Sequence, residues 1–266
     1  MTKRIVIKIG TSSLVLANGQ LNLRTIDRLA FTLATLNNQG YELILVSSGA
    51  IGVGLASLNL KDRPEAIDQQ QALAAIGQAE LMRIYSQRFL DYQTHVAQLL
   101  LTKDVLDFPV SRQHTLNTIN ALLKQHIIPI INENDPVSVD ELDHHTTFSD
   151  NDELSAQVAT TTDADLLIIL SDIDALYDRD PHRYADAQII RTVSTLTPEI
   201  KAAAGTSSTK FGTGGMVTKL RAAERMIENE KEMILCSGQH PQIIFDIFDG
   251  QSVGTHFGKK KVFNHE

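Results

Sequence analysis

Two lysines stand in sequence surroundings that favour phosphate binding. Lys8 interrupts a run of Ile and Val, and Gly10-Thr11-Ser12 follow it directly. Burial of an unpaired ammonium is costly, so an anion is expected to meet Lys8, and a glycine turn lets backbone N–H groups approach phosphate oxygens. Lys219 lies one turn inside an expected helix that follows the glycines of residues 212–215. Helix-start amides and an ammonium group together form an anion site.

Each of these patterns taken alone has a plainer explanation. Lys8 can extend from a strand edge to solvent, and the glycines of residues 212–215 can form an ordinary loop. The second pattern is not a Walker A loop, because Thr218 and Leu220 flank Lys219. If the two lysines converge, they suit phosphoryl transfer, in which cations and Mg²⁺ stabilise charge on the moving group. A carboxylate acceptor is already ionised at neutral pH and needs no general base.

Polar loops follow several expected strands and supply groups for an amino-acid acceptor. Ser48, Gly49 and Ala50 offer donors, while Asn132-Glu133-Asn134-Asp135 and Asp150-Asn151-Asp152 offer carboxylates and amides. Asp135 is expected to pair with an α-ammonium group. The alternatives are a polar turn for the first acidic segment and a helix cap at Asn151 or Asp152 for the second. A helix-cap position faces the same region beyond the strand ends where the acceptor would bind, so one residue can both cap the helix and bind the acceptor.

The surrounding pattern predicts the elements that position these loops. Continuous apolar runs predict strands at residues 4–9, 41–46, 95–101, 127–131, 166–170 and 232–236. Helices are predicted at residues 23–36, 66–92, 111–125, 154–162 and 216–229, the first between a cap at Asn22 and a stop at Gly40. This alternation predicts an α/β protein, a three-layer αβα sandwich with a mainly parallel central sheet. Ligands of such folds bind beyond the carboxyl ends of the strands.

Composition and charge narrow the class of protein. The 266 residues are 42% hydrophobic and 21% charged, as in an ordinary globular chain, and we expect one catalytic domain over residues 1–266. A formal charge of −8 argues against nucleic acid as a partner. Cys236 is the single cysteine and no apolar run approaches about 18 residues. We therefore expect a cytoplasmic protein without a membrane partner. Residues 204–215 are expected to form a mobile flap.

The motifs together resemble those of the amino-acid kinase family, over essentially the full chain and in family order. Within that family they are most similar to the members that phosphorylate L-glutamate. The matching segments are Val6-Ile7-Lys8-Ile9-Gly10-Thr11-Ser12-Ser13, Val46-Ser47-Ser48-Gly49-Ala50-Ile51-Gly52, Ile131-Asn132-Glu133-Asn134-Asp135, Asp150-Asn151-Asp152, Leu170-Ser171-Asp172 and Gly212-Thr213-Gly214-Gly215-Met216.

The resemblance implies a role for each matched position. Lys8 and Lys219 correspond to the lysines that bind the transferred phosphoryl group, and Asp152 to the carboxylate that orients them. The glutamate-binding positions correspond to Ser48, Asp135 and Asn151. The ATP-binding positions correspond to Ser171, Asp172, Thr213, Gly214, Gly215, Met216, Val217, Thr218 and Lys219. Mg²⁺ is implied as the counterion of the nucleotide, with no residue assigned as its ligand.

The implied reaction forms L-glutamyl 5-phosphate from ATP and L-glutamate, the first step of proline biosynthesis. The family also implies a homodimer or homotetramer and feedback inhibition by proline. Many members carry an additional C-terminal RNA-binding-like PUA domain, which we expect this chain to lack, and residues 139–149 depart from the usual family pattern. The competing hypotheses are acetylglutamate kinase, aspartokinase or uridylate kinase activity within the family, and a sensor of glutamate or proline without turnover.

Overall fold

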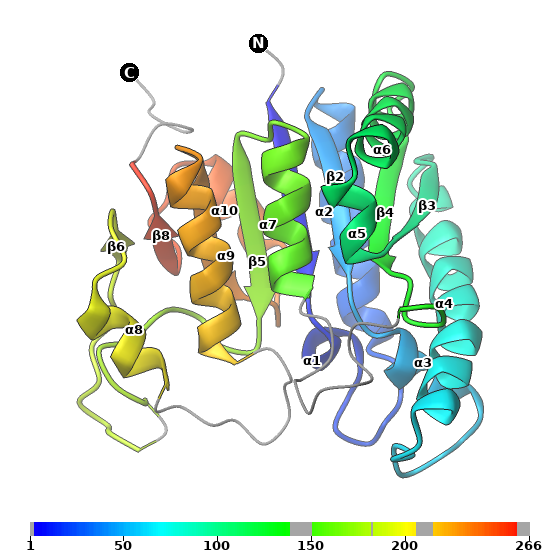
Figure 1. The fold of residues 1–266 in the computed structure, drawn as a ribbon, viewed down its shortest axis with the longest axis horizontal. Helices are drawn as coiled ribbons and strands as arrows, with labels where there is room; N and C mark the ends of the chain where they lie inside the picture. The colour runs from blue at the N-terminus through cyan, green and yellow to red at the C-terminus, as the bar shows by residue number, and fades with distance from the viewer. Residues whose placement is uncertain (1–2, 139–150, 182, 206–214, 260–266) are drawn as a thin grey trace.

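The computed structural model describes residues 3–138, 151–181, 183–205 and 215–259. These residues form the predicted three-layer αβα sandwich around an eight-stranded sheet (Figure 1). The strands are β1 (Arg4–Ile9), β2 (Glu42–Ser47), β3 (Val96–Leu101), β4 (Ile128–Glu133), β5 (Leu166–Ser171), β6 (Thr192–Val193), β7 (Glu232–Ser237) and β8 (Thr255–Phe257). The helices are α1 (Thr11–Leu14), α2 (Leu23–Asn38), α3 (Ala50–Ser57), α4 (Ile67–Leu90), α5 (Lys103–Asp107), α6 (Pro109–Leu123), α7 (Asn151–Thr161), α8 (Pro198–Gly205), α9 (Met216–Glu228) and α10 (Ile243–Phe248).

The sheet is mainly parallel, in the order β3-β4-β2-β1-β5-β7-β8-β6. The pairing of β7 with β8 is antiparallel, and the other paired strands run parallel. The register places Ile9 opposite both Ser47 and Leu170. The carboxyl ends of β4, β2, β1 and β5 therefore meet at one edge of the sheet, which carries α1 and α3 at the bottom of Figure 1.

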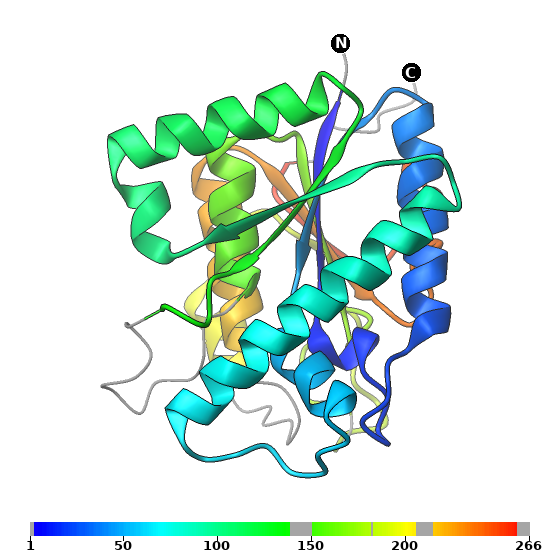
Figure 2. The same cartoon turned by 90° about the vertical axis from the view of Figure 1, so that its right-hand side faces the viewer.

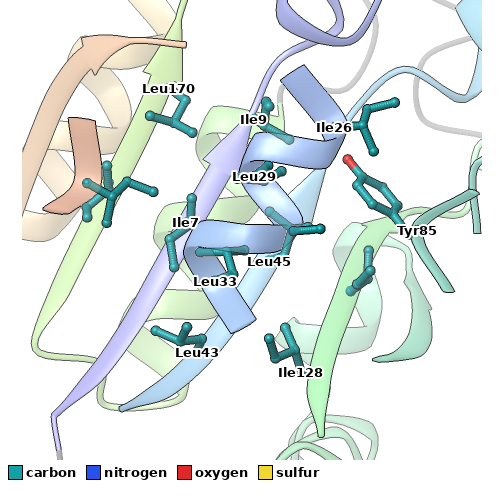
Figure 3. Packing of buried hydrophobic residues seen from close by; sticks show 14 of the residues in the cluster. Ile7, Ile9, Ile26, Leu29, Leu33, Leu43, Leu45, Tyr85, Ile128 and Leu170 are labelled. Carbon is teal, nitrogen blue, oxygen red and sulfur yellow. The ribbon is translucent and has the colours of Figure 1, made fainter. Parts of the chain in front are cut away.

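Helices cover both faces of the sheet, which explains the continuous apolar strands. On one face α2, α4 and α10 pack against alternate residues of the central strands. Figure 3 shows Ile7 and Ile9 of β1 packed against Leu29 and Leu33 of α2. The opposite face packs against α5, α6, α7 and α9, and the two layers are seen on either side of the strands in Figure 2. A strand buried on both faces carries apolar residues at every position rather than every second one.

The predicted strands and helices are confirmed, with ends that differ by up to three residues. The predicted limits of α2 have local causes. The side-chain oxygen of Asn22 accepts a hydrogen bond from the Thr25 backbone N–H at 3.2 Å, and Gly40 has a φ of +92°. An N-cap acceptor satisfies an otherwise unpaired helix amide, and glycine adopts the left-handed conformation without steric cost.

The structure corrects two expectations and adds two strands. Residues after β1 form the one-turn helix α1 rather than a plain turn, and β6 and β8 were not predicted. Helix α7 begins at Asn151, so Asn151 and Asp152 lie inside its first turn rather than preceding it as caps. Most of the predicted flap at residues 204–215, and the segment 139–149, lie outside the described residues. No helix within the described ranges is both long enough and apolar enough to cross a bilayer.

Candidate active site

Lys8 and Lys219, which are distant in the chain, converge on one buried carboxylate. Lys8 Nζ lies 2.6 Å from Asp152 Oδ1, and Lys219 Nζ lies 3.1 Å from Asp152 Oδ2. The exposed fractions are 6% for Lys8, 4% for Lys219 and 0% for Asp152. Each residue comes from a different element, β1, α9 and α7 respectively, and α7 packs against both of the others. The two ammonium groups therefore face each other across one carboxylate.

The electrostatics of this cluster favour an added anion. Burial alone would raise the pKa of Asp152, but the charges and hydrogen bonds of Lys8 and Lys219 outweigh burial and lower the pKa to about 2. The carboxylate is thus ionised at neutral pH. Two ammonium groups and one carboxylate leave a net charge of +1 on these three side chains, and a phosphate oxygen is a suitable counter-charge.

Backbone turns surround this cluster with potential phosphate ligands. A Cβ atom at Gly10 would lie 3.5 Å from Lys8 Nζ, so the turn after β1 lies against the ammonium group. Gly215 occupies the N-cap position of α9, which leaves first-turn amides of this helix available to an anion. The Thr218 hydroxyl hydrogen-bonds to Asp152 Oδ2 at 3.2 Å and to the Gly215 carbonyl at 2.8 Å. This start of α9 is thereby tied to the lysine cluster.

The remaining nucleotide-binding candidates differ in their surroundings. Ser171 ends β5, next to β1, and its hydroxyl donates to Asp172 Oδ1 at 2.9 Å. The Met216 side chain packs in the core, so a ligand contact from this position would use its backbone. Val217 is 43% exposed. Thr213 and Gly214 lie outside the described residues.

A cavity of about 220 Å³ opens beside the lysine cluster. It brings together predicted acceptor-binding residues from the loops after β2 and β4 and from the start of α7. Asn134 does not line it, whereas Thr11, expected on the nucleotide side, does. The lining residues are Thr11, Ser48, Gly49, Ala50, Ile51, Gly52, Leu55, Arg63, Asn132, Asp135 and Asn151. Thr11 and Asn151 are chain neighbours of Gly10 and Asp152, so the cavity lies next to the lysine cluster.

Close backbone packing fixes the wall of this cavity formed by α3. A Cβ atom at Gly77 of α4 would lie 1.8 Å from the Ala50 carbonyl oxygen, which no side chain tolerates. Gly49 has a φ of +102°, a conformation that glycine adopts readily and other residues rarely do. These two glycines allow the chain to turn from β2 into α3 and α3 to lie directly against α4. The first turn of α3 therefore lines the cavity in a fixed position.

A buried amide network orients Asn151. The Glu133 backbone N–H donates to Asn132 Oδ1 at 2.9 Å, which identifies that atom as the acceptor. Asn132 Nδ2 then donates to Gln78 Oε1 at 2.8 Å, and Asn151 Nδ2 donates to Asn132 Oδ1 at 3.2 Å and to Ser48 Oγ at 2.9 Å. The Asn151 Oδ1 atom is buried and has no hydrogen-bond partner among the described residues. Buried polar atoms are normally satisfied, so this acceptor is suited to a ligand donor.

Two charged residues complete the cavity wall. Burial raises the pKa of Asp135 to about 6, and the nearby charge of Arg63 partly offsets this effect. An incoming ammonium group would favour the ionised form of Asp135. Arg63 and Gln78 were not among the predicted site residues, because nothing in the local sequence of a polar loop or a long helix shows that its residues lie near the cavity.

Among the described residues, no group of three or more His, Cys, Asp or Glu side chains is arranged to hold a metal ion.

Comparisons with known proteins agree with this fold and identify the family. Residues 3–237 match the amino acid kinase family model. The glutamate 5-kinase of Ligilactobacillus salivarius is 55% identical, covering 97% of this chain and 97% of that protein. The glutamate 5-kinase of Lactiplantibacillus plantarum is 56% identical, covering 96% and 97% respectively.

Solved structures show the same architecture at much lower identity. The carbamate kinase of Giardia lamblia bound to AMP-PNP has a TM-score of 0.67 at 17% identity, covering 97% of this chain and 99% of that one. The UMP kinase of Bacillus anthracis has a TM-score of 0.62 at 15% identity, covering 97% of each chain. These similarities concern the fold alone. The family match, together with the close relatives, shows that this chain belongs to the amino acid kinase family.

Proposed function

We propose that this chain transfers the γ-phosphoryl group of ATP to the side-chain carboxylate of L-glutamate and forms L-glutamyl 5-phosphate, the first step of proline biosynthesis. The observation that carries the proposal is the convergence of Lys8 and Lys219 beside a cavity suited to a zwitterion. Relatives above 50% identity over nearly the whole chain are glutamate 5-kinases. Geometry and relationship therefore support the same reaction.

In the proposed reaction, an oxygen of the glutamate γ-carboxylate attacks the γ-phosphorus, and the bond from that phosphorus to the bridging oxygen breaks. The electron pair of that bond leaves with ADP. The attacking carboxylate is already ionised, so no residue has to remove a proton. Lys8 and Lys219 stabilise the charge that spreads over the oxygens of the moving group. Asp152 holds both ammonium groups in place and acts as a positioning residue.

The described residues fit a nucleoside triphosphate on the side of the lysines away from the acceptor cavity. Gly10 leaves space against the Lys8 ammonium, and the first amides of α9 lie close to the cluster. Ser171 and Asp172 lie at the neighbouring strand end, where they can contact the rest of the nucleotide. Mg²⁺ would accompany the phosphates as their counterion and neutralise their charge.

The cavity fits the acceptor by its charges and donors. The first amides of α3, at Ala50, are placed to donate to a carboxylate, and Ser48 adds a hydroxyl. Asp135 and the Asn151 Oδ1 atom are acceptors for the α-ammonium group. We assign glutamate binding to these residues and to Gly49, which shapes the turn.

The decisive experiment measures acyl phosphate directly. The protein is incubated with ATP, Mg²⁺ and one of L-glutamate, N-acetyl-L-glutamate or L-aspartate, and the product is trapped with hydroxylamine. We expect hydroxamate with L-glutamate and little with the other two. Product formed mainly from N-acetylglutamate or aspartate would replace the proposed substrate.

Lys219→Ala separates an enzyme from a sensor. We expect kcat to fall by about 100-fold or more, as when a charge-stabilising donor is lost, with a small change in glutamate affinity. The control is Lys201→Ala, because Lys201 pairs with Glu224 on the surface and is outside the cavity. Retention of near wild-type turnover by Lys219→Ala would remove the basis of the mechanism. Glutamate binding without any acyl phosphate from the wild-type protein would favour the sensor.

The resemblance to the family supports two further proposals, feedback inhibition by proline and a homodimer or homotetramer. Proline carries an amino group and a carboxylate on one carbon, as glutamate does, so it is expected to raise the KM for glutamate. Light scattering after size-exclusion chromatography would give the number of chains.

A further inference from the structure

Arg63 is a charged residue of the cavity wall that the proposed mechanism does not use. It lies in the loop between α3 and α4, and its guanidinium group is anchored rather than loose. Arg63 Nε and Nη2 donate to Gln70 Oε1 at 3.1 and 2.9 Å. Gln70 Nε2 in turn donates to the Pro64 carbonyl at 2.8 Å and to the Glu65 carbonyl at 3.3 Å. This buried glutamine therefore holds both the loop and the Arg63 side chain.

Arg63 adds a positive charge to a cavity wall that also carries the carboxyl group of Asp135. Thr11 of the cavity lining follows Gly10, which lies against the Lys8 ammonium group, where the transferred phosphoryl group belongs. Arg63 and Asp135 both line this wall and lie close enough for the arginine charge to influence the carboxyl group. A positive and a negative group on one cavity wall match an α-carbon that carries one carboxylate and one ammonium group.

We propose that Arg63 determines acceptor specificity by binding the α-carboxylate of the amino acid, while Asp135 receives its α-ammonium group. This inference rests on the proposed function, because it assumes that the other carboxylate of the acceptor faces the lysines. A guanidinium group can bind a carboxylate through two hydrogen bonds, and such charge-assisted contacts are stronger than neutral ones. The backbone amides of α3 remain available for the reacting carboxylate.

The test compares L-glutamate with L-isoglutamine, in which the α-carboxylate is replaced by a neutral amide of similar size. Kinetics with both acceptors are measured for the wild type, Arg63→Gln and Arg63→Lys. For glutamate we expect Arg63→Gln to reduce kcat/KM by about 10- to 100-fold, mainly through KM, and Arg63→Lys to reduce it less. For isoglutamine we expect little change, so the preference for glutamate falls by the same factor.

A matched control is Arg83→Gln, since Arg83 is an exposed arginine of α4 that pairs with Glu80 outside the cavity. This variant should leave kcat/KM unchanged for both glutamate and isoglutamine. If Arg63→Gln lowered kcat/KM equally for glutamate and isoglutamine, Arg63 would only support the loop, and the inference would be overturned. An unchanged preference for glutamate would overturn it as well.

Calorimetric binding of the two acceptors to the same proteins separates this inference from the proposed reaction. A wild type that binds glutamate more tightly than isoglutamine, with a difference that Arg63→Gln removes, supports the role of Arg63 even if no acyl phosphate forms. Absence of acyl phosphate alone contradicts the reaction, and a binding preference that Arg63→Gln leaves intact contradicts the role of Arg63.

Discussion

Asp152→Asn tests whether one buried carboxylate holds the two lysines together. Asp152 is 0% exposed, and its oxygens lie 2.6 Å from Lys8 Nζ and 3.1 Å from Lys219 Nζ. The substitution keeps the size of the side chain and removes its negative charge. Two buried ammonium groups then lose the charge they share, so we expect a large loss of stability in the absence of ligand.

The expected magnitude follows from the burial of all three groups. Loss of one partner from a buried ion pair costs about 3–5 kcal/mol, which for a domain of this size lowers Tm by about 6–20 °C. The lowered pKa of Asp152, about 2, gives the pH dependence of this stabilisation. Because the folded pKa lies below the unfolded value, the contribution of Asp152 is complete above about pH 4 and is lost as the pH falls through about 2.

Thermal and urea unfolding at neutral pH measure this effect, with Glu153→Gln as the matched control. Glu153 is the next residue of α7, is exposed, and lies 3.8 Å from Arg221, so the control removes the same charge at the surface. We expect the control to change stability by less than about 1 kcal/mol. We also expect ATP to raise the Tm of Asp152→Asn more than that of the wild type, because phosphate oxygens replace the missing negative charge.

Two outcomes would refute this reasoning. If Asp152→Asn lowered Tm no more than Glu153→Gln, the carboxylate would not be needed to hold the lysines. If ATP stabilised both proteins equally, its phosphates would not contact the lysine cluster.

Two further predictions concern acceptor binding. Burial raises the pKa of Asp135 to about 6, so the KM for glutamate is expected to fall as the pH rises from about 5 to about 7, and Asp135→Asn should remove this dependence. The free protein should lose stability as the pH rises from about 4 to about 6, because the pKa of Asp135 is higher in the folded than in the unfolded state. An unchanged KM across this range would contradict the pairing with the α-ammonium. Gln78→Met removes the oxygen that accepts the Asn132 hydrogen bond and should raise the glutamate KM about 10-fold with a small change in kcat. Gln78→Glu keeps an acceptor oxygen and should retain a near wild-type KM. Equal KM values for these two variants would argue against positioning of Asn132 by Gln78.

The sequence predicted the core strands because burial on both faces leaves a clear signal. Strand β1 reads Arg-Ile-Val-Ile-Lys-Ile, and five of its six residues are buried. Strands β6 and β8 have two and three residues, too few to show periodicity. Their place depends on contacts across the fold, such as the pairing of His256 with Glu232 of β7 at 2.8 Å. Local patterns cannot reveal elements that tertiary contacts create.

The same distinction separates the predicted site residues from the missed ones. Lys8 was visible because a charge inside an apolar strand requires a partner. The local pattern at Asp152 allowed either an acceptor-loop carboxylate or a helix cap, and its role in orienting the two lysines was implied only by the family resemblance. The approach of β1 and α9 to α7 makes Asp152 the shared partner of both lysines. Arg63 carried no signal, because an arginine in a polar loop is ordinary unless the fold places that loop over a cavity.

The arrangement of the site follows from these constraints on charge. A buried lysine pair without a carboxylate would be costly to fold, and a fully neutralised pair would have little attraction for phosphate. One carboxylate between two ammonium groups leaves a single positive charge, which permits folding and retains affinity for an anion. If Asp152 sets this balance, then the loss of stability in Asp152→Asn and the added stabilisation by ATP should both occur in the same variant.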